Sequence, residues 1–240
     1  FFVMEYVDGR LFSDATLPGL SSAARRAIYF ELIRVLAALH SVDYEALGLS
    51  DFGKSGNYYA RQIGRLSQQY VSAKTDEIPS MENLMGYLPR NVPPDDITCL
   101  VHGDYRLENM LFHPTEPRIL ALLDWELSTL GHPFGDLAYS CGAYHFTTSG
   151  NPSLQGICGP ESGIPLESEF IEEYCRRTGR AGIPNWNFYM AFAFFRLASI
   201  CQGVYKRGLM GTASSTQALE KGRLSRSISD LAWSFIENGS

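Results

Sequence analysis

Two short motifs constrain the fold of this chain more than any other feature of its sequence. Residues 101–109 read VHGDYRLEN and place Asp104 five positions before Asn109. Residues 119–126 read ILALLDWE, an apolar run that brings Asp124 fifteen positions after Asn109. The intervening segment 113–117, HPTEP, contains two prolines, which interrupt a strand and favour a turn. The pattern predicts a β-hairpin with strands at about 107–112 and 118–123.

The hairpin would fix where its polar residues lie. Pairing of residue 113 with residue 118 puts Asn109 opposite about Leu122. Asp124 then lies on the same face, one pleat further along. Such a diagonal pair is roughly 7–8 Å apart at the backbone, so both side chains can share one cation. Carboxylate and amide oxygens suit Mg²⁺, which keeps several waters and takes its other ligands from phosphate oxygens.

The same residues meet the needs of phosphoryl transfer, in which one carboxylate takes a hydroxyl proton while an amide and a second carboxylate hold magnesium. An isolated aspartate or asparagine usually caps a turn. It is the combination of Asp104, Asn109 and Asp124 that favours a functional site. His102 is expected to be a hydrogen-bonded structural histidine. Arg106 is compatible both with steering an anionic substrate or phosphate and with a solvated loop arginine.

The HGD sequence at 102–104 with Asn109, followed by DWE at 124–126, resembles the signature of the aminoglycoside phosphotransferase and choline kinase group. These are small-molecule kinases with a protein-kinase-like fold. The run LSTLGHPFGDLA at 127–138 extends the resemblance. It is most similar to the phosphotransferase-like domain that occurs alone in bacteria or fused to acyl-CoA dehydrogenases. The similarity covers nearly the whole chain, from Met4 to the last helix.

The resemblance implies a role for each motif residue. Asp104 would be the catalytic base, or would orient the acceptor hydroxyl, and His102 would support its loop. Asn109 and Asp124 would bind Mg²⁺ and, through it, ATP. Glu126 would either bind a second metal ion or face the substrate.

Arg106 is placed with Asp104 and His102 in the predicted catalytic group because its guanidinium could steer an anionic substrate or a phosphate. Further residues receive roles from the resemblance. Asp136 would brace the catalytic loop from a following helix; the alternative is a carboxylate that is merely stabilised by the helix dipole. Met4, Glu5 and Tyr6 look like the hinge whose backbone pairs with the adenine of ATP.

The implied fold is α+β and protein-kinase-like, mostly the helical C-terminal lobe with a small catalytic β-hairpin. Such a kinase also needs an N-terminal lobe, with a flexible loop over the phosphates and a strand lysine. The chain opens at the expected hinge, and Lys54 and Lys74 come too late to supply that lysine. We therefore expect the N-terminal lobe to be largely absent, in a fragment or in a degenerate relative. Residues 1–10 would be a hinge or linker, and residues 11–240 the helical lobe.

Composition narrows the possible partners. Hydrophobic residues make up 45% and charged residues 19% of the chain, as in a folded globular protein. The net charge of −6 argues against nucleic-acid binding, which relies on basic patches. Five scattered cysteines without a C-x-x-C pair argue for a reducing compartment, the cytoplasm, and against a zinc site. No apolar stretch is expected to approach a membrane span.

Apolar periodicity and turn residues predict a mostly helical chain without repeats. Ser21 or Ser22 should cap the first helix, and the last turn of another should end near Gly179. A strand is expected at 98–102 and a long loop at 147–165. The expected helices cover about 22–40, 57–74, 81–88, 135–144, 166–177, 187–206 and 214–236.

The acceptor is less constrained than the chemistry. Aminoglycosides and choline are cationic and call for acidic walls, but the loop at 150–169 offers only Glu161, Glu167 and Glu169. The similarity to domains fused to acyl-CoA dehydrogenases points instead to a hydroxylated acyl thioester or another small hydroxyl compound. Five aromatic residues either line an acceptor pocket or belong to the core: Tyr58, Tyr59, Tyr144, Trp186 and Tyr189.

Two functions therefore remain open. The first is an ATP- and magnesium-dependent small-molecule kinase that binds nucleotide and a hydroxyl substrate. The second is a pseudokinase-like binding module that holds a ligand and transfers nothing. The intact set of Asp104, Asn109 and Asp124 favours the kinase, because a pure binder needs neither a base nor metal ligands. The missing strand lysine favours the binding module.

Overall fold

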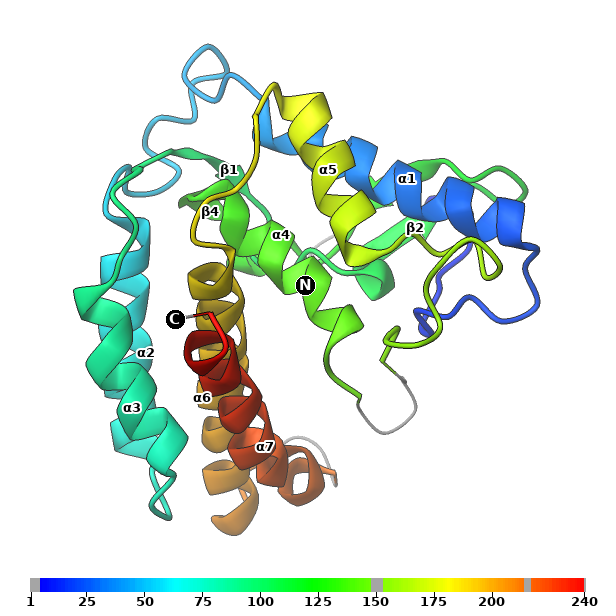
Figure 1. Cartoon of the computed structure of the whole chain (residues 1–240). Coiled ribbons are helices and arrows are strands. Elements are labelled where there is room, and N and C mark those ends of the chain that lie inside the picture. Colours follow the sequence, from blue (N-terminus) through cyan, green and yellow to red (C-terminus); the bar gives the residue numbers. More distant parts are fainter. Residues whose placement is uncertain (1–4, 148–152, 214–216, 240) are drawn as a thin grey trace. The chain divides into compact units, whose positions relative to one another are not determined.

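The computed structural model describes residues 5–147, 153–213 and 217–239, which form two compact units (Figure 1). The first unit contains the residues up to Gly53 together with Cys99–Ile183. The second, helical unit contains Lys54–Thr98 together with the residues from Pro184 onward. Both motifs lie in the first unit.

The described residues of the first unit form three helices and two very small sheets. Its helices are α1 (Ser22–His40), α4 (Pro133–Cys141) and α5 (Glu167–Thr178). Its strands are β1 (Cys99–Val101), β2 (Met110–Phe112), β3 (Ile119–Leu122) and β4 (Thr129–Gly131). Single 3₁₀ turns lie at η2 (Leu107–Asn109), η3 (Trp125–Leu127) and η4 (Gly142–Tyr144). Helix α1 packs along α5 and also contacts β1 and β3 (Figure 1).

Helix α1 forms where its caps and apolar stripe predict. The Ser21 hydroxyl accepts a hydrogen bond from the Ala24 N–H at 3.2 Å, which satisfies one of the free donors of the first turn. Ile28, Leu32 and Leu36 recur at helical spacing and are buried. Helix α5 ends at Gly179, which takes the left-handed conformation at φ 69°. The predictions of a serine cap and a glycine stop are confirmed.

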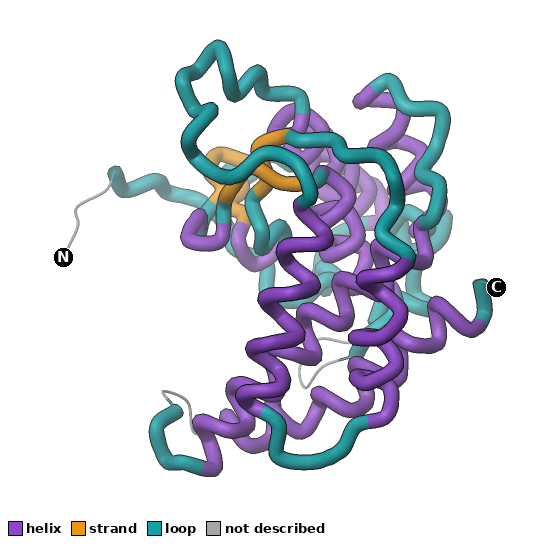
Figure 2. Tube along the Cα trace, turned by 90° about the vertical axis from the view of Figure 1, so that its left-hand side faces the viewer, coloured by secondary structure: helices purple, strands orange, loops and turns teal. Residues whose placement is uncertain are grey.

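The described strands form two separate antiparallel pairs. Figure 2 shows the strands in orange. Strand β1 pairs with β4, with Cys99 opposite Gly131. Strand β2 pairs with β3 as the predicted hairpin. Strand β2 is shorter than expected, because residues 107–109 turn into η2 instead of extending the strand.

The predicted register of the hairpin is wrong by one residue. Met110, not Asn109, lies opposite Leu122. The reason is a bulge, because Leu111 pairs with residue 121 and Phe112 with residue 119, so Leu120 is an extra residue. Asn109 therefore lies opposite residue 123, and the predicted same-face pairing with Asp124 does not occur.

The segment before α1 pairs with the outer edge of the hairpin. The Arg10 N–H donates to the Phe112 carbonyl at 2.8 Å, and the Phe112 N–H donates back at 2.9 Å. The Arg10 guanidinium also donates to the main-chain carbonyls of His113 and Glu116. These bonds cover the edge of β2 that β3 leaves open.

The helical unit contains four helices and one 3₁₀ turn among its described residues. They are α2 (Tyr58–Ala73), α3 (Pro79–Tyr87), η1 (Leu88–Arg90), α6 (Trp186–Leu209) and α7 (Ala218–Glu237). Helix α6 packs along most of α7 and also against α2. The predicted helices are confirmed, with ends that differ by a few residues, as is usual for helix boundaries. The expected start of the last helix, at 214–216, lies outside the described residues.

Helix α6 corrects the expectation that no segment approaches a membrane span. Among the described residues it is the one helix whose length and composition would allow it to cross a membrane. In the structure 67% of its most apolar window is buried. A helix that is apolar on most sides is expected in the centre of a folded helical unit.

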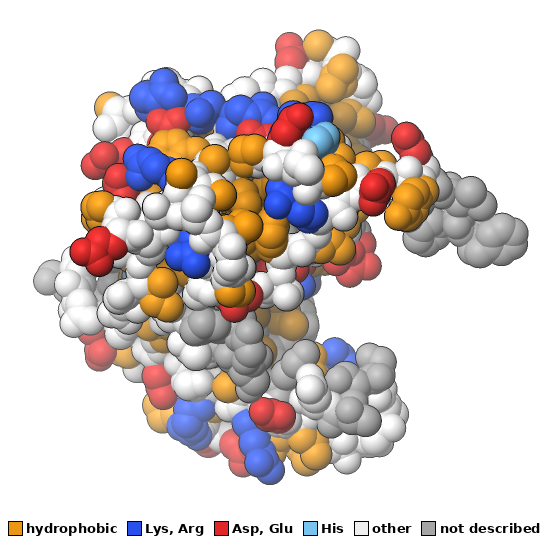
Figure 3. Space-filling model, turned by 90° about the vertical axis from the view of Figure 1, so that its right-hand side faces the viewer, with side chains coloured by type: hydrophobic (Ala, Val, Ile, Leu, Met, Phe, Trp, Pro, Cys, Tyr) orange, Lys and Arg blue, Asp and Glu red, His pale blue; other side chains and the backbone are white. Residues whose placement is uncertain are grey.

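Charged side chains of both signs are mixed over the face of the molecule drawn in Figure 3. Blue basic and red acidic groups lie next to each other, with apolar side chains between them. This pattern and the net charge of −6 are those of an ordinary protein surface.

Candidate functional site

One buried carboxylate holds the loop that follows β1 through hydrogen bonds to its backbone. The Asp136 side chain in α4 accepts the His102 N–H at 2.7 Å and the Gly103 N–H at 2.8 Å. Burial alone would raise the pKa of Asp136, but hydrogen bonds from the His40 side chain and from the two backbone N–H groups lower it below its usual value. The carboxylate therefore stays ionised and fixes two consecutive peptide groups of the loop.

Glycine is required at the turn of this loop. Gly103 has φ 82°, a left-handed conformation that other residues adopt at a cost. A Cβ atom there would lie 2.4 Å from the Leu127 carbonyl oxygen. The loop consequently passes in direct backbone contact over η3, the turn that follows Asp124.

Asp104 and Asn109 are joined by a pair of hydrogen bonds. The Asn109 amide nitrogen donates to the Asp104 main-chain carbonyl at 2.9 Å and to its Oδ2 at 2.8 Å. The Arg106 Nε atom lies 3.3 Å from the same Oδ2. Asp104 Oδ1 makes no hydrogen bond with the described residues, and the side chain is 14% exposed. One carboxylate oxygen is thus held by the protein while the other is available to an incoming hydroxyl group.

Leu123 connects the Asp104 loop to the strand that ends at Asp124. The Leu123 N–H donates to the Asn109 carbonyl at 2.8 Å. The Leu123 carbonyl accepts a hydrogen bond from His102 Nε2 at 2.9 Å. Both peptide groups that flank Leu123 are therefore tied to the 102–109 segment, and this connection replaces the predicted pleat.

The two bonds of His102 define its tautomer. A carbonyl only accepts, so Nε2 carries the proton that bonds to Leu123. The Asp104 N–H only donates, so Nδ1 accepts it, at 3.2 Å. His102 is fully buried, and the Trp125 ring lies 4.8 Å from its ring. It has the structural position that its sequence context predicts.

Asp124 directly follows this connection and carries an exposed side chain. Its backbone is left-handed at φ 65°, and its carboxylate has no hydrogen bond or ion pair with the described residues. Burial lowers the pKa of Arg106, but Tyr139 and three neighbouring carboxylates raise it above the usual value. Two of these carboxylates are Asp104 and Asp124, so both aspartates lie within the field of the same guanidinium.

The donor set fits a magnesium ion. The Asn109 nitrogen is committed to Asp104, which leaves its oxygen, Oδ1, as the group that can bind a cation. Asp124 offers an unpaired carboxylate. No cluster of three or more histidine, cysteine or acidic side chains occurs among the described residues. Two oxygen ligands with waters and phosphate oxygens are typical of Mg²⁺.

The other predicted site residues lie at the margin of this group or outside it. Glu126 is exposed in η3, and its side chain makes no hydrogen bond or ion pair with the described residues. Glu5 and Tyr6 are exposed, Tyr6 by 87%. Met4 falls outside the described residues. A metal role for Glu126 and an adenine-binding role for the 4–6 segment stay predictions.

Sequence patterns did not reveal three residues whose polar contacts support the loop. The buried Tyr105 hydroxyl donates to the Leu32 carbonyl of α1 at 2.8 Å. His40, at the end of α1, lies with its Nε2 3.4 Å from Asp136 Oδ2. The Tyr174 hydroxyl of α5 lies 2.7 Å from His40 Nδ1. The available signal was a tyrosine inside the loop motif and a histidine at a helix end.

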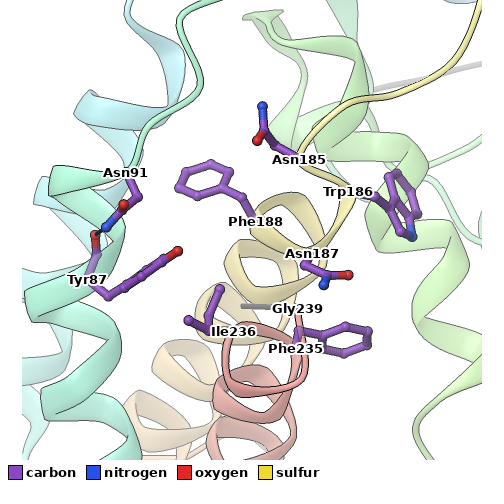
Figure 4. Close-up of a pocket in the computed structure, with 9 residues that line it drawn as sticks. All are labelled: Tyr87, Asn91, Asn185, Trp186, Asn187, Phe188, Phe235, Ile236 and Gly239. Atoms are coloured by element: carbon purple, nitrogen blue, oxygen red, sulfur yellow. Dashed lines mark hydrogen bonds between the residues drawn. The ribbon is translucent and has the colours of Figure 1, made fainter.

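The aromatic residues of the helical unit divide into core and pocket. The Tyr59 ring lies within 5.5 Å of the rings of Tyr58, Phe188 and Tyr189 in a buried cluster. Tyr58, Tyr59 and Tyr189 are therefore core residues. Trp186 lines a pocket of about 440 Å³ whose described lining contains no acidic or basic side chain (Figure 4). Its lining residues are Tyr87, Asn91, Asn185, Trp186, Asn187, Phe188, Phe235, Ile236 and Gly239.

Comparison with known proteins identifies the family of the chain. Residues 1–189 match the family described as the phosphotransferase enzyme family, abbreviated APH. A protein from Ralstonia eutropha JMP134, whose assignment as an aminoglycoside phosphotransferase is provisional, has a solved structure 50% identical in sequence. The match has a TM-score of 0.95 and covers 98% of this chain and 72% of that one.

Two further relatives show how widely the fold occurs. Mouse acyl-CoA dehydrogenase family member 10 is 49% identical over 238 residues, which are 98% of this chain. The chain spans only 22% of that protein's length. The streptomycin–ATP complex of APH(2")-IIa is 15% identical, with a TM-score of 0.54, and the match covers 95% of this chain and 70% of the other. That last likeness concerns the fold alone.

The prediction of a protein-kinase-like fold and of this group of relatives is confirmed. The family match includes the HGD loop, Asn109, Asp124 and the bracing Asp136. The chain therefore belongs to the phosphotransferase enzyme family.

Proposed function

We propose that the protein containing this chain is an ATP- and magnesium-dependent phosphotransferase that transfers the γ-phosphate to a hydroxyl group of a small molecule. One observation carries the proposal. The Asn109 amide nitrogen donates a hydrogen bond to Asp104. The main chain of Leu123 makes one hydrogen bond to Asn109 and one to His102, which ties the residue before Asp124 to the same loop. This arrangement supplies a positioned carboxylate and two oxygen ligands, which phosphoryl transfer requires.

Each residue of the site has a separate role in the proposed reaction. Asp104 Oδ2 is fixed by Asn109 and Arg106, so Oδ1 accepts the proton of the acceptor hydroxyl. The hydroxyl oxygen forms a bond to the γ-phosphorus as the bond from that phosphorus to the β,γ-bridging oxygen breaks, and ADP leaves with that oxygen. Asn109 Oδ1 and the Asp124 carboxylate would hold the magnesium ion. Magnesium held by these two residues would supply positive charge to offset the charge that develops on the phosphate oxygens. His102 and Asp136 keep the loop rigid, which maintains the distance between base and ligands.

The names of the relatives bear on the choice of acceptor more than the local charge does. The Arg106 guanidinium lies 3.3 Å from Asp104 and is 47% exposed. Three neighbouring carboxylates, among them Asp104 and Asp124, act on the same guanidinium, so the charge beside the base is mixed and does not select an anionic or a cationic acceptor by itself. Several relatives are named for acyl-CoA chemistry, and an acyl-CoA thioester carries phosphate groups. We therefore favour a hydroxylated acyl thioester as acceptor over an aminoglycoside or an amino alcohol.

The test uses the full-length protein and ATP labelled at the γ-phosphate. Candidate acceptors are hydroxylated acyl thioesters, amino sugars and amino alcohols, measured side by side with and without Mg²⁺. We expect label transfer to a hydroxylated acyl thioester, only with the metal ion, and at least roughly 100-fold less transfer by Asp104→Asn. Transfer to amino sugars alone would support the kinase but overturn the choice of acceptor.

The same experiment addresses the pseudokinase alternative. Binding of Mg²⁺ and ATP with no transfer to any acceptor and no ATP hydrolysis would favour the binding module. Equal turnover by the wild type, Asp104→Asn and Asp124→Asn would contradict the assigned residues even if transfer occurs. We further propose that the protein acts in a reducing compartment such as the cytoplasm, with five free cysteine thiols as support.

A further inference from the structure

We propose that His40 and Tyr174 are positioning residues that hold the catalytic loop through Asp136, with Tyr174 selecting the tautomer of His40. The proposal rests on the proposed function for its kinetic readout, and on geometry alone for its structural readout. Neither residue belongs to a motif. His40 is the last residue of α1, and Tyr174 lies in α5.

The buried side chains of Tyr174, His40 and Asp136 are linked in series by polar contacts. The Tyr174 hydroxyl lies 2.7 Å from His40 Nδ1. His40 Nε2 lies 3.4 Å from Asp136 Oδ2. The His40 and Asp136 side chains are 2% and 3% exposed, and Tyr174 is fully buried. Because α1 packs along α5, this series of contacts connects two long helices to α4 and, through Asp136, to the peptide groups of the loop.

Chemistry sets the direction of each hydrogen bond. Burial raises the pKa of Tyr174 above its usual value, so its hydroxyl keeps a proton to donate. The lowered pKa of Asp136 keeps that carboxylate ionised, and an ionised carboxylate only accepts. A proton on His40 Nε2 is therefore needed for a hydrogen bond to Asp136. In the arrangement that we propose, the Tyr174 hydroxyl donates to His40 Nδ1 and so selects the tautomer that carries its proton on Nε2.

This tautomer matters because Asp136 Oδ2 has two donors. It accepts the His102 N–H at 2.7 Å and also faces His40 Nε2. If His40 carried its proton on Nδ1, its Nε2 lone pair would face the carboxylate, and the two would repel each other. Asp136 would then turn away from His102, and the loop that carries Asp104 would lose its anchor. Partners of this indirect kind typically change activity by roughly 10–100-fold when they are removed.

The experiment compares four variants of the full-length protein. Tyr174→Phe keeps the ring and removes the hydroxyl. His40→Leu removes both ring nitrogens, whereas His40→Gln keeps an oxygen to accept from Tyr174 and a nitrogen to donate to Asp136. Tyr29→Phe is the matched control, because its buried hydroxyl donates to the Ala15 carbonyl at 2.6 Å outside this chain of residues.

The kinetic readout separates positioning from general stability. We expect Tyr174→Phe and His40→Leu to lower kcat roughly 10–100-fold with the KM for ATP changed less than about two-fold. We expect His40→Gln to restore most of kcat. Tyr29→Phe should lower the melting temperature comparably to Tyr174→Phe and leave kcat unchanged. If Tyr174→Phe and Tyr29→Phe have the same kcat, the positioning role is wrong.

The structural readout needs no turnover. With ¹⁵N-labelled histidine, the wild-type His40 signals should show a protonated Nε2 and a bare Nδ1. In Tyr174→Phe this pattern should change, and the Gly103 amide proton should move with it. A wild-type His40 that is protonated on Nδ1, or on both nitrogens, overturns the proposal. These spectra remain decisive if the protein transfers no phosphate, so failure of the kinase assignment and failure of this inference are told apart.

Discussion

Replacement of Gly103 by alanine tests the close contact between the catalytic loop and η3. Gly103 has φ 82°, and a Cβ atom would lie 2.4 Å from the Leu127 carbonyl oxygen and 2.9 Å from the Leu127 Cβ. Gly179 is a matched control, since it has φ 69° and a Cβ atom there would meet no other atom within 4 Å. Both glycines lie in the first unit.

The expected destabilisation follows from these two environments. A left-handed alanine costs about 1–2 kcal/mol at either position. Overpacking adds about 1–3 kcal/mol at Gly103 only, because the neighbour that must move is backbone. We therefore expect a loss of about 2–5 kcal/mol in the free energy of unfolding for Gly103→Ala and about 1–2 kcal/mol for Gly179→Ala.

The activity of the two variants should differ more than their stability. Relief of the clash must move either the loop that carries Asp104 or the turn after Asp124. A displacement of about 1 Å can cost roughly 100-fold in rate. Urea unfolding gives the stability, and label transfer from ATP at a temperature where both variants are folded gives the rate. Equal stability and equal rates for the two variants would refute the claim that the loop rests on η3.

Three further results are expected from the same geometry. Asp104→Asn should lower kcat roughly 10²–10⁴-fold and leave the affinity for ATP unchanged, as measured by equilibrium binding. Asp124→Asn should weaken the binding of Mg²⁺–ADP as well as turnover, which calorimetry with and without the metal ion can separate. Asp136 has a lowered pKa in the folded state, so its stabilising effect is present above the unfolded pKa of about 4 and is lost as the pH falls through the lower folded value. The difference in urea midpoint between the wild type and Asp136→Asn should therefore shrink on acidification below about pH 4.

Local signals in the sequence located most elements. The serine cap of α1, the glycine stop of α5 and the apolar stripes each act within a few residues, so they can be recognised without knowledge of the tertiary contacts. The family motif is similarly compact. Its spacing is sufficient to predict that Asp104, Asn109 and Asp124 belong to one site.

The hairpin register shows where local signals fail. The apolar run at 119–123 contains nothing that marks Leu120 as a bulge, because a bulge depends on how the partner strand is anchored. The expected pleat between Asn109 and Asp124 is consequently absent. Instead, the hydrogen bonds of Leu123 with Asn109 and His102 tie the residue before Asp124 to the 102–109 segment.

Contacts between residues that are far apart along the chain were also not indicated by the sequence. His40 is 96 residues from Asp136 and 134 residues from Tyr174, and no periodicity links positions so far apart. These contacts depend on the packing of α1 against α5, which single-sequence patterns do not encode. The sequence predicted that Asp136 braces the loop, but not what holds Asp136.

The most direct test of the central claim is a crystal structure of the full-length protein with Mg²⁺ and a non-hydrolysable ATP analogue. We predict one ion with Asn109 Oδ1 and an Asp124 carboxylate oxygen both about 2.1 Å away, and with phosphate oxygens among its other ligands. Asp104 Oδ1 should face the space beyond the γ-phosphate. An ion bound elsewhere, with Asn109 and Asp124 pointing apart, would contradict the account.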